Sequence, residues 1–327
     1  MKNKIVVLLK IVVSLGLISI LVSQVDFNEI INILINVNLT MIICAIVLLT
    51  IQVFIAATRW KFVLKCQKIT LDYKNTLQIL WSGLFFNQAM PSSVGGDVIR
   101  GYYLKAQGIT LGRATIGVLM DRLFGMVGLV LLVLISLPLL FGLVNDPIAR
   151  TGVLLISLGI SFALLFIFFT DKLPGNFSHL RVIRVFYSLS QDGRRCITKR
   201  YNGPIIIVIS VLIHLISVVA VITIAIGLEL NIDWGGFLLI VPLVGLMMLV
   251  PISIAGWGVR EGAMVVGFGY LGVASEAALA LSILYGLSML LVALPGGVVW
   301  ALKRSHTSIK KQNQALVEDY KDKYEKD

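Results

Sequence analysis

Charged residues are scarce in this sequence: only 14% of its 327 residues are Asp, Glu, Lys or Arg, whereas 58% are hydrophobic. A water-soluble domain of this length cannot bury so large an apolar fraction in one core. An apolar run of roughly 20 residues is long enough to cross a hydrocarbon core of ~30 Å. Such runs occur at 4–23, 39–57, 115–141, 151–170, 204–228 and 277–301. The sequence therefore predicts an all-α, polytopic integral membrane protein with about six full crossings.

Signatures of soluble enzymes are also missing. The sequence has no Gly-rich nucleotide loop, no H-E-x-x-H pair, and no Ser, His and Asp set that spacing supports. Its three cysteines, Cys44, Cys66 and Cys196, show no metal-binding spacing, and we expect no metal site and no disulfide from them. We therefore predict no recognisable catalytic domain and no cofactor, and we leave open the role of a membrane transferase.

The few charges are unevenly placed along a chain with a formal net charge of +11. Lys and Arg gather in the loops expected at 58–75, which include Arg59, and at 171–203, whereas 24–38 and 229–235 carry only acidic charges. The positive-inside rule places the basic segments, both termini and the charged tail at 304–327 in the cytoplasm. The same topology favours a retained first helix over a cleaved signal peptide. We expect no nucleic-acid binding, because no folded basic domain presents these charges.

Two further apolar runs, 76–99 and 236–273, are interrupted by Pro and Gly. If 76–99 crossed the membrane once, the basic segments on its two sides would face opposite compartments. In the second run, the 11 residues from Gly262 to Gly272 would form only ~17 Å of helix, which is too short to span. We therefore expect both runs to be re-entrant hairpins, in addition to the full crossings.

The two hairpins resemble each other when Pro91 is aligned with Pro251. "PSSVGGDVIR" then lies over "PISIAGWGVR", and the same shift places 115–141 over 275–301. Each unit would cross the membrane an odd number of times, so the second would be inverted relative to the first.

These units predict a transmembrane domain of residues 1–303, with repeat one at about 1–145 and repeat two at about 146–303. Inverted repeats with Gly/Pro-broken segments at equivalent positions are typical of transporters whose substrate site lies near the membrane midplane.

The polar residues of the hairpins are candidate substrate-binding groups. A broken helix leaves backbone N–H groups unpaired, glycines let an anion approach them, and an arginine fork suits a phosphate. The carboxylates would neutralise the arginines in an empty site or contact an ammonium group on the substrate. The predicted site comprises Asn87, Pro91, Ser93, Gly95, Gly96, Asp97, Arg100, Asp121, Arg122, Ser253, Gly256, Gly258, Arg260 and Glu261.

Structural roles are the alternative for the charged candidates. Arg100 would then be an anchor at the cytoplasmic interface, and Arg260 with Glu261 an ion pair that holds the repeats together. For Asp121–Arg122, pairing with a hairpin charge is favoured over contact with substrate.

Three more residues are expected to have structural roles. His214, alone in an apolar run, is interpreted as a packing residue with its hydrogen bonds satisfied. Trp60 and Trp234 are interpreted as anchors at the membrane interface.

The chain resembles the lysylphosphatidylglycerol synthase transmembrane family, also called the flippase-like domain family. The resemblance rests on "RW" at Arg59–Trp60, "NQAMPSSVGGDVIRGYYL", "DRLFG" at 121–125 and "GWGVREG" at 256–262, and covers about residues 1–303. Members include the membrane portion of the multiple peptide resistance factor, which moves aminoacylated phosphatidylglycerol between leaflets. We expect this protein to differ from that factor in having no C-terminal aminoacyl-transfer domain, and therefore not to make lysyl-lipid.

The resemblance implies a lipid translocase of the cell membrane that moves an anionic or aminoacylated phospholipid, or a polyprenyl-phosphate-linked lipid, between leaflets. The alternative is a membrane-embedded subunit that binds lipid phosphate, or a transferase component, in the biosynthesis of envelope lipid or glycan. The implied partner is the lipid itself, and a homo-oligomer or an associated envelope-biosynthesis transferase is left open.

Overall fold

The protein is built from helices, and the part of the chain that the structure describes contains no strand. The computed structural model describes residues 2–23, 25–90, 94–172, 181–198, 202–249 and 253–324. The elements are α1 (Lys2–Ser23), α2 (Phe27–Ile35), α3 (Leu39–Cys66), α4 (Tyr73–Ala89), α5 (Gly95–Ala106), α6 (Leu111–Leu143), α7 (Pro147–Phe169), the 3-10 turn η1 (Thr170–Lys172), α8 (Arg181–Thr198), α9 (Asn202–Gly227), α10 (Trp234–Met247), α11 (Val259–Gly269) and α12 (Ser275–Tyr324). The predicted all-α class is confirmed.

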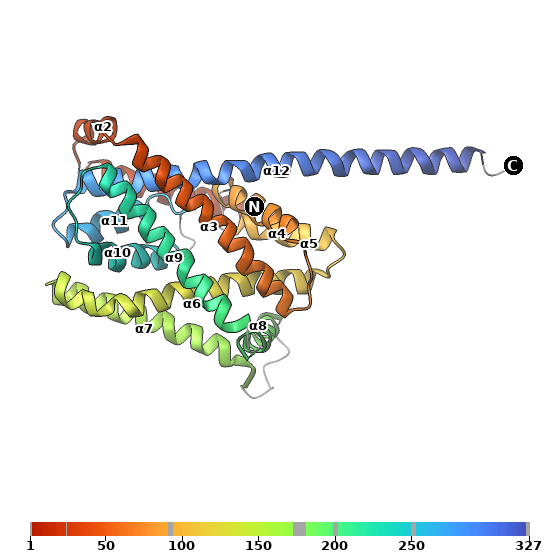
Figure 1. The fold of residues 1–327 in the computed structure, drawn as a ribbon, viewed down its shortest axis with the longest axis horizontal. Coiled ribbons are helices and arrows are strands. Elements are labelled where there is room, and N and C mark those ends of the chain that lie inside the picture. The colour runs from red at the N-terminus through yellow and green to blue at the C-terminus, as the bar shows by residue number, and fades with distance from the viewer. Residues whose placement is uncertain are drawn as a thin grey trace.

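Five helices in the described ranges are long and apolar enough to cross a membrane. They are α3, α6, α7 with η1, α9, and α12 from Ser275 to Lys303. These helices correspond to five of the six predicted apolar runs, and the first run forms α1, with a shorter apolar stretch at Lys10–Leu21. Beyond the apolar part, α12 continues to Tyr324 and projects from the body of the molecule (Figure 1). The chain is therefore a polytopic membrane protein.

Four shorter helices form two consecutive pairs where the sequence predicts hairpins. Helices α4 and α5 have 17 and 12 residues, and α10 and α11 have 14 and 11. At about 1.5 Å per residue, none of them reaches the ~30 Å of a hydrocarbon core. The members of each pair pack against each other. In Figure 1 the α4–α5 pair lies toward the end that holds α8, and the α10–α11 pair lies toward the opposite end.

An aspartate begins the first helix of each pair. The side chain of Asp72 accepts a hydrogen bond from the backbone N–H of Asn75, and that of Asp233 accepts one from Gly235. Such caps satisfy backbone donors that an α-helix leaves without partners. These polar caps thus determine the residue at which the first helix of each pair begins.

The centre of the molecule is the contact between α3 and α9, which cross it side by side (Figure 1). Each short pair then packs against a long helix from the other half of the chain, α4 on α12 and α10 on α6. The α4–α12 contact is close: the indole N–H of Trp81 donates to the Val292 carbonyl at 2.7 Å, and a Cβ on Gly296 would overlap the Trp81 carbonyl.

The prediction of a loop at 171–203 is wrong. The segment 171–203, expected as a loop, contains α8, which packs against α6, α7 and α9. Its helical pattern is amphipathic rather than uniformly apolar, with Leu189 and Cys196 buried, so a search for long apolar runs passes over it.

The expectation of no disulfide is also wrong, because Cys66 at the end of α3 is bonded to Cys196 in α8, with their Cα atoms 5.5 Å apart. The two cysteines are 130 residues apart in the chain, and only the packing of α8 brings them together.

Candidate functional site

A cavity of about 240 Å³ lies where the ends of the two short pairs meet. Its walls come from α3, the C-terminal part of α4, the end of α10 with the turn that precedes α11, and α12. The lining residues are Leu49, Gln52, Val53, Leu84, Asn87, Gln88, Met248, Ala255, Gly256, Met289, Val292 and Ala293. Two of the predicted site residues, Asn87 and Gly256, therefore meet in one cavity although they belong to different hairpins.

The turn before α11 has an unusual backbone. Ala255, Gly256 and Gly258 have φ values of 50°, 85° and 86°. Glycine adopts this left-handed region freely, whereas Ala255 is strained there, and a Cβ on Gly256 would lie 2.5 Å from the Met248 Cε. The N–H of Gly258 donates to the Glu261 carboxylate at 2.6 Å, which fixes the start of α11. Strained turns of this kind gather at functional sites.

Amide side chains supply the polar groups of the cavity. The Gln52 amide donates to the Ile213 carbonyl at 2.8 Å and to the Ser217 hydroxyl at 2.7 Å, and so ties α3 to α9. The Asn87 Oδ1 accepts a hydrogen bond of 2.9 Å from the N–H of Gly96, the second residue of α5. These contacts hold the cavity walls in place with neutral groups, and the remaining lining is mostly apolar.

Glycine contacts close the first pair. A Cβ on Gly96 would overlap the Gly83 carbonyl oxygen and would lie 2.6 Å from the Asn87 Oδ1. A Cβ on Gly83 would lie 2.8 Å from the Arg100 Cγ. Since backbone meets backbone here, α4 and α5 approach each other closely only because both positions are glycine.

Beside the cavity, the first pair contributes to a buried charge cluster. The Asp121 carboxylate in α6 accepts from Arg59 in α3 at 2.9 Å and from Arg100 in α5 at 2.7 Å. All three side chains are buried. Asp97 pairs with Arg100 at 3.5 Å and also with Arg122. The predicted pairing of Asp121–Arg122 with hairpin charges is confirmed.

An aromatic ring completes this cluster. The Arg100 guanidinium lies over the Trp60 indole, 4.0 Å from the ring centroid. Trp60 is fully buried, so its interpretation as an interface anchor is wrong, whereas Trp234 is 70% exposed. The interpretation of Arg100 as an interface anchor is wrong for the same reason, since Arg100 is only 7% exposed.

The second pair holds a smaller charge cluster. Arg260 and Glu261 are 1% and 3% exposed and form an ion pair with each other. The Arg260 Nε also donates to the Ser282 hydroxyl of α12 at 3.3 Å. The Arg260 guanidinium lies 4.6 Å from the centroid of the Trp257 ring. Arg100 and Arg260 thus share a setting of carboxylate and indole, and neither lines the central cavity.

The structure distributes the predicted site residues among three places. Asn87 and Gly256 line the cavity; Gly95, Gly96, Asp97, Arg100, Asp121 and Arg122 belong to the first hairpin and its charge cluster; Ser253, Gly258, Arg260 and Glu261 belong to the second. Pro91 and Ser93 lie outside the described residues, as does Pro251.

Sequence reasoning missed Gln52, and it counted Arg59 among the charges of a basic loop. The "RW" motif at Arg59–Trp60 was a usable signal, because both residues join the first cluster. His214 behaves as predicted: its Nε2 lies 2.9 Å from the Gly125 carbonyl of α6.

This combination of a multi-helix membrane body and buried hairpin charges agrees with the match to known proteins. The Lysylphosphatidylglycerol synthase TM region family matches residues 7–297. The chain belongs to this family. A relative, the UPF0104 membrane protein MJ1595 of Methanocaldococcus jannaschii, is 34% identical over 104 residues, which is 31% of this chain and 31% of that protein. The family match covers all of the cavity-lining residues and both charge clusters.

Proposed function

We propose that this protein of the Lysylphosphatidylglycerol synthase TM region family is a lipid translocase. In this proposal it moves an anionic or aminoacylated phospholipid, or a polyprenyl-phosphate-linked lipid, between leaflets, and it carries out no enzymatic reaction. The observation that carries the proposal is the cavity between the two hairpin ends, with amide side chains inside it and a buried arginine–carboxylate cluster beside each hairpin.

The proposal includes two inverted repeats with re-entrant hairpins. Helix packing supports this symmetry, because the contacts of α4 with α12 and of α5 with α6 have counterparts in α10 with α6 and α11 with α12. The shift that aligns Pro91 with Pro251 also places α4 over α10, α5 over α11 and α6 over α12. The contacts of α4 and α5 therefore correspond to those of α10 and α11. In this arrangement each hairpin enters from its own side, and the two ends meet at the midplane, as in transporters with broken helices.

The buried arginines suggest how a charged headgroup is accommodated. With no substrate, Arg100 and Arg260 are neutralised by Asp121, Asp97 and Glu261. An arginine fork can bind a phosphate in place of a carboxylate, and each displaced carboxylate would keep another partner: Asp121 keeps Arg59, and Glu261 keeps the Gly258 N–H and the Ser282 hydroxyl. We propose that hairpin movement brings this exchange about, so that a headgroup passes between the hairpin ends without leaving any arginine unpaired.

Leaflet-resolved lipid movement in proteoliposomes tests the proposal. Full-length protein is reconstituted with fluorescent phosphatidylglycerol or phosphatidylcholine, and the outer leaflet is bleached with dithionite. We expect the protein to accelerate exposure of phosphatidylglycerol more than that of phosphatidylcholine. Gln88→Leu in the cavity should slow this movement, whereas Gln191→Leu on the exposed face of α8 should not. If the protein binds phosphatidylglycerol but neither the unmodified protein nor any variant moves it between leaflets, translocation would be rejected and a lipid-binding subunit favoured.

Cysteine labelling tests the hairpins and the orientation together. In a background with Cys44, Cys66 and Cys196 replaced by serine, Lys74→Cys and Gln107→Cys flank the first pair. Asn231→Cys and Ala274→Cys flank the second pair. An impermeant reagent outside the cell should label the second two positions and neither of the first two. Labelling of only one position within either pair would contradict the re-entrant arrangement.

A further inference from the structure

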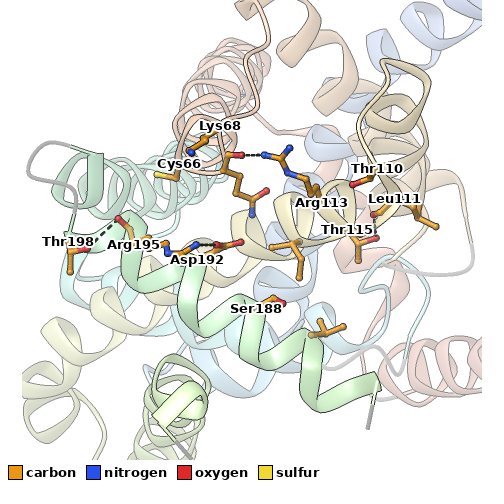
Figure 2. Close-up of a pocket in the computed structure, with 14 residues that line it drawn as sticks. Cys66, Lys68, Thr110, Leu111, Arg113, Thr115, Ser188, Asp192, Arg195 and Thr198 are labelled. Atoms are coloured by element: carbon orange, nitrogen blue, oxygen red, sulfur yellow. Dashed lines mark hydrogen bonds and ion pairs between the residues drawn. The ribbon is translucent and has the colours of Figure 1, made fainter. Parts of the chain in front are cut away.

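A second cavity lies away from the hairpin ends, where the end of α3 and the start of α6 face α8 (Figure 2). Its volume is about 1260 Å³. The central cavity takes its walls from other residues, so the two sites are separate. The two charge clusters described above do not line this second cavity either.

The second cavity is lined by an excess of positive charge. Lys68 follows α3, Arg113 lies in the first turn of α6, and Arg195 lies on α8. The only acidic residue among the lining side chains is Asp192, which pairs with Arg195 at 3.5 Å. Figure 2 shows Lys68 and Arg113 on one side of the cavity and Asp192 with Arg195 on the other. An anion in the cavity would therefore meet a net charge of about two positive units.

The start of α6 adds backbone donors to these cations. Thr110 precedes the helix, and its side chain makes no capping hydrogen bond. The N–H groups of Leu111, Gly112 and Arg113 consequently have no acceptor within the helix. No atom would lie within 4 Å of a Cβ on Gly112, so the backbone at this point is open to a ligand. The positive end of a 33-residue helix thus faces the cavity.

An independent observation indicates that a polar ligand is missing. Gln67 lines the same cavity and is 8% exposed, yet within the described chain neither its Nε2 nor its Oε1 has a hydrogen-bond partner. Buried amides are normally satisfied, and an unsatisfied one is costly. The residue is held in place because Arg113 donates to its backbone carbonyl. A ligand oxygen would supply the missing acceptor for the Nε2 group.

The two walls of the cavity are also fixed relative to each other. Cys66 lines the cavity from α3, and its bond to Cys196 attaches that wall to α8. A site whose charged groups are already held in position loses less entropy when it binds a ligand. The cavity therefore has cations, helix N–H groups and an unsatisfied amide on a connected frame.

We propose that this cavity binds a phosphate group, held between Lys68, Arg113 and Arg195 at the N-terminus of α6, with the Gln67 amide as a further donor. Several cations and backbone N–H groups converge on one place, which suits the multiple oxygens and charge of a phosphate. The phosphate belongs either to a soluble molecule or to a lipid headgroup, the latter reached beside Val185 and Phe186, which α8 exposes.

Phosphate binding to the purified full-length protein tests this assignment. Thermal unfolding is followed while inorganic phosphate or diphosphate is added at constant ionic strength, with chloride as the reference. We expect a saturable rise in Tm, because a ligand of the folded state stabilises it. Lys68→Gln should weaken the apparent affinity roughly tenfold, as expected for loss of one charged hydrogen bond. Lys65→Gln, an exposed lysine one turn earlier that does not line the cavity, is the matched control.

A second variant separates ligand binding from folding. Gln67→Leu removes the unsatisfied amide and keeps a side chain of similar size, so we expect an unchanged or higher Tm without phosphate. The same variant should bind phosphate several-fold more weakly. A lower Tm together with unchanged phosphate affinity would show that Gln67 has only a structural role, and would overturn its assignment as a donor.

Two further measurements identify the source of the phosphate. Native mass spectrometry of protein from nanodiscs with equal phosphatidylglycerol and phosphatidylcholine reports retained lipid. Preferential loss of phosphatidylglycerol in Lys68→Gln, relative to Lys65→Gln, would assign a lipid headgroup. A Tm response to diphosphate without such lipid retention would assign a soluble phosphate. Equal behaviour of the two lysine variants in both measurements would overturn the proposal.

Discussion

The two helical hairpins, α4–α5 and α10–α11, neutralise their buried arginines in different ways. In the first, Arg100 of α5 reaches Asp121 of α6, which also holds Arg59 of α3, so one carboxylate joins three helices. In the second, Arg260 pairs with its chain neighbour Glu261, and the Ser282 hydroxyl of α12 is the added partner. The first cluster therefore couples the positions of several helices, whereas the second keeps its ion pair if α11 moves as a unit.

This difference suggests which hairpin moves more easily. Moving α5 relative to α6 breaks two ion pairs between these helices, Arg100 with Asp121 and Asp97 with Arg122, which is expensive in a low-dielectric interior. Moving α11 carries both members of its ion pair along and breaks only the contact with Ser282. We expect the first hairpin to be the more rigid of the two, and the substitutions below test this comparison.

The largest effect is expected from Asp121→Asn. It leaves both Arg59 and Arg100 without their shared carboxylate, and we expect a loss of about 3–5 kcal/mol in the free energy of unfolding. Glu261→Gln removes the partner of one arginine and should cost less. Denaturant unfolding in detergent, followed by tryptophan fluorescence, measures both, with exposed Glu29→Gln as the control. A greater loss for Glu261→Gln would reverse the comparison.

Removing both members of a pair sharpens the same contrast. Arg260→Gln combined with Glu261→Gln leaves no orphan charge, so it should recover roughly 2 kcal/mol or more relative to Arg260→Gln alone. Arg100→Gln combined with Asp121→Asn should recover little stability relative to Arg100→Gln alone, because Arg59 is then buried without its carboxylate partner. A double-mutant cycle on each pair gives the two coupling energies. Similar recovery in both hairpins would show that the first cluster is not a shared network.

Glycine substitutions compare the packing of the two hairpins with a smaller effect. In Gly96→Ala the new Cβ would meet the backbone of Gly83, which cannot move aside, and we expect a loss of about 1–3 kcal/mol. In Gly286→Ala it would meet the flexible end of Arg260, so the loss should be smaller. Gly101→Ala, on the same helix as Gly96 but with open space around its Cβ, is the matched control. Melting temperatures should rank the three variants in that order.

The smallest effect is expected from the indole rings. Trp257→Phe weakens the contact between ring and guanidinium by about 0.5–1 kcal/mol. Trp60→Phe weakens the same contact but also removes a buried indole N–H that has no hydrogen-bond partner among the described residues, so part of its cost is offset. Isothermal denaturation of the two variants measures these losses in the free energy of unfolding. If Trp257→Phe lost more stability than Gly96→Ala, the expected order of effects would be wrong.

The sequence by itself determined the class of the protein, its apolar crossings and the places where two apolar runs break. Hydropathy and the effects of Pro and Gly act locally along the chain, so the intervals 76–99 and 236–273 already indicated short paired helices. The motifs around Arg59, Asp121 and Arg260 also marked residues that the structure buries. Local patterns were sufficient for these conclusions because each depends on neighbours within one or two helical turns.

Only the tertiary structure decided which of these residues meet. Asp121 takes Arg59 as a partner across 62 positions of the sequence, Gln52 contacts Ser217 across 165, and Cys66 joins Cys196 across 130. A buried charge or amide has many candidate partners in a chain of this length, and the choice depends on how whole helices pack. The amphipathic helix α8 was missed because its pattern is not a long apolar run, but its place against α6, α7 and α9, which closes the second cavity, depends on how the helices pack.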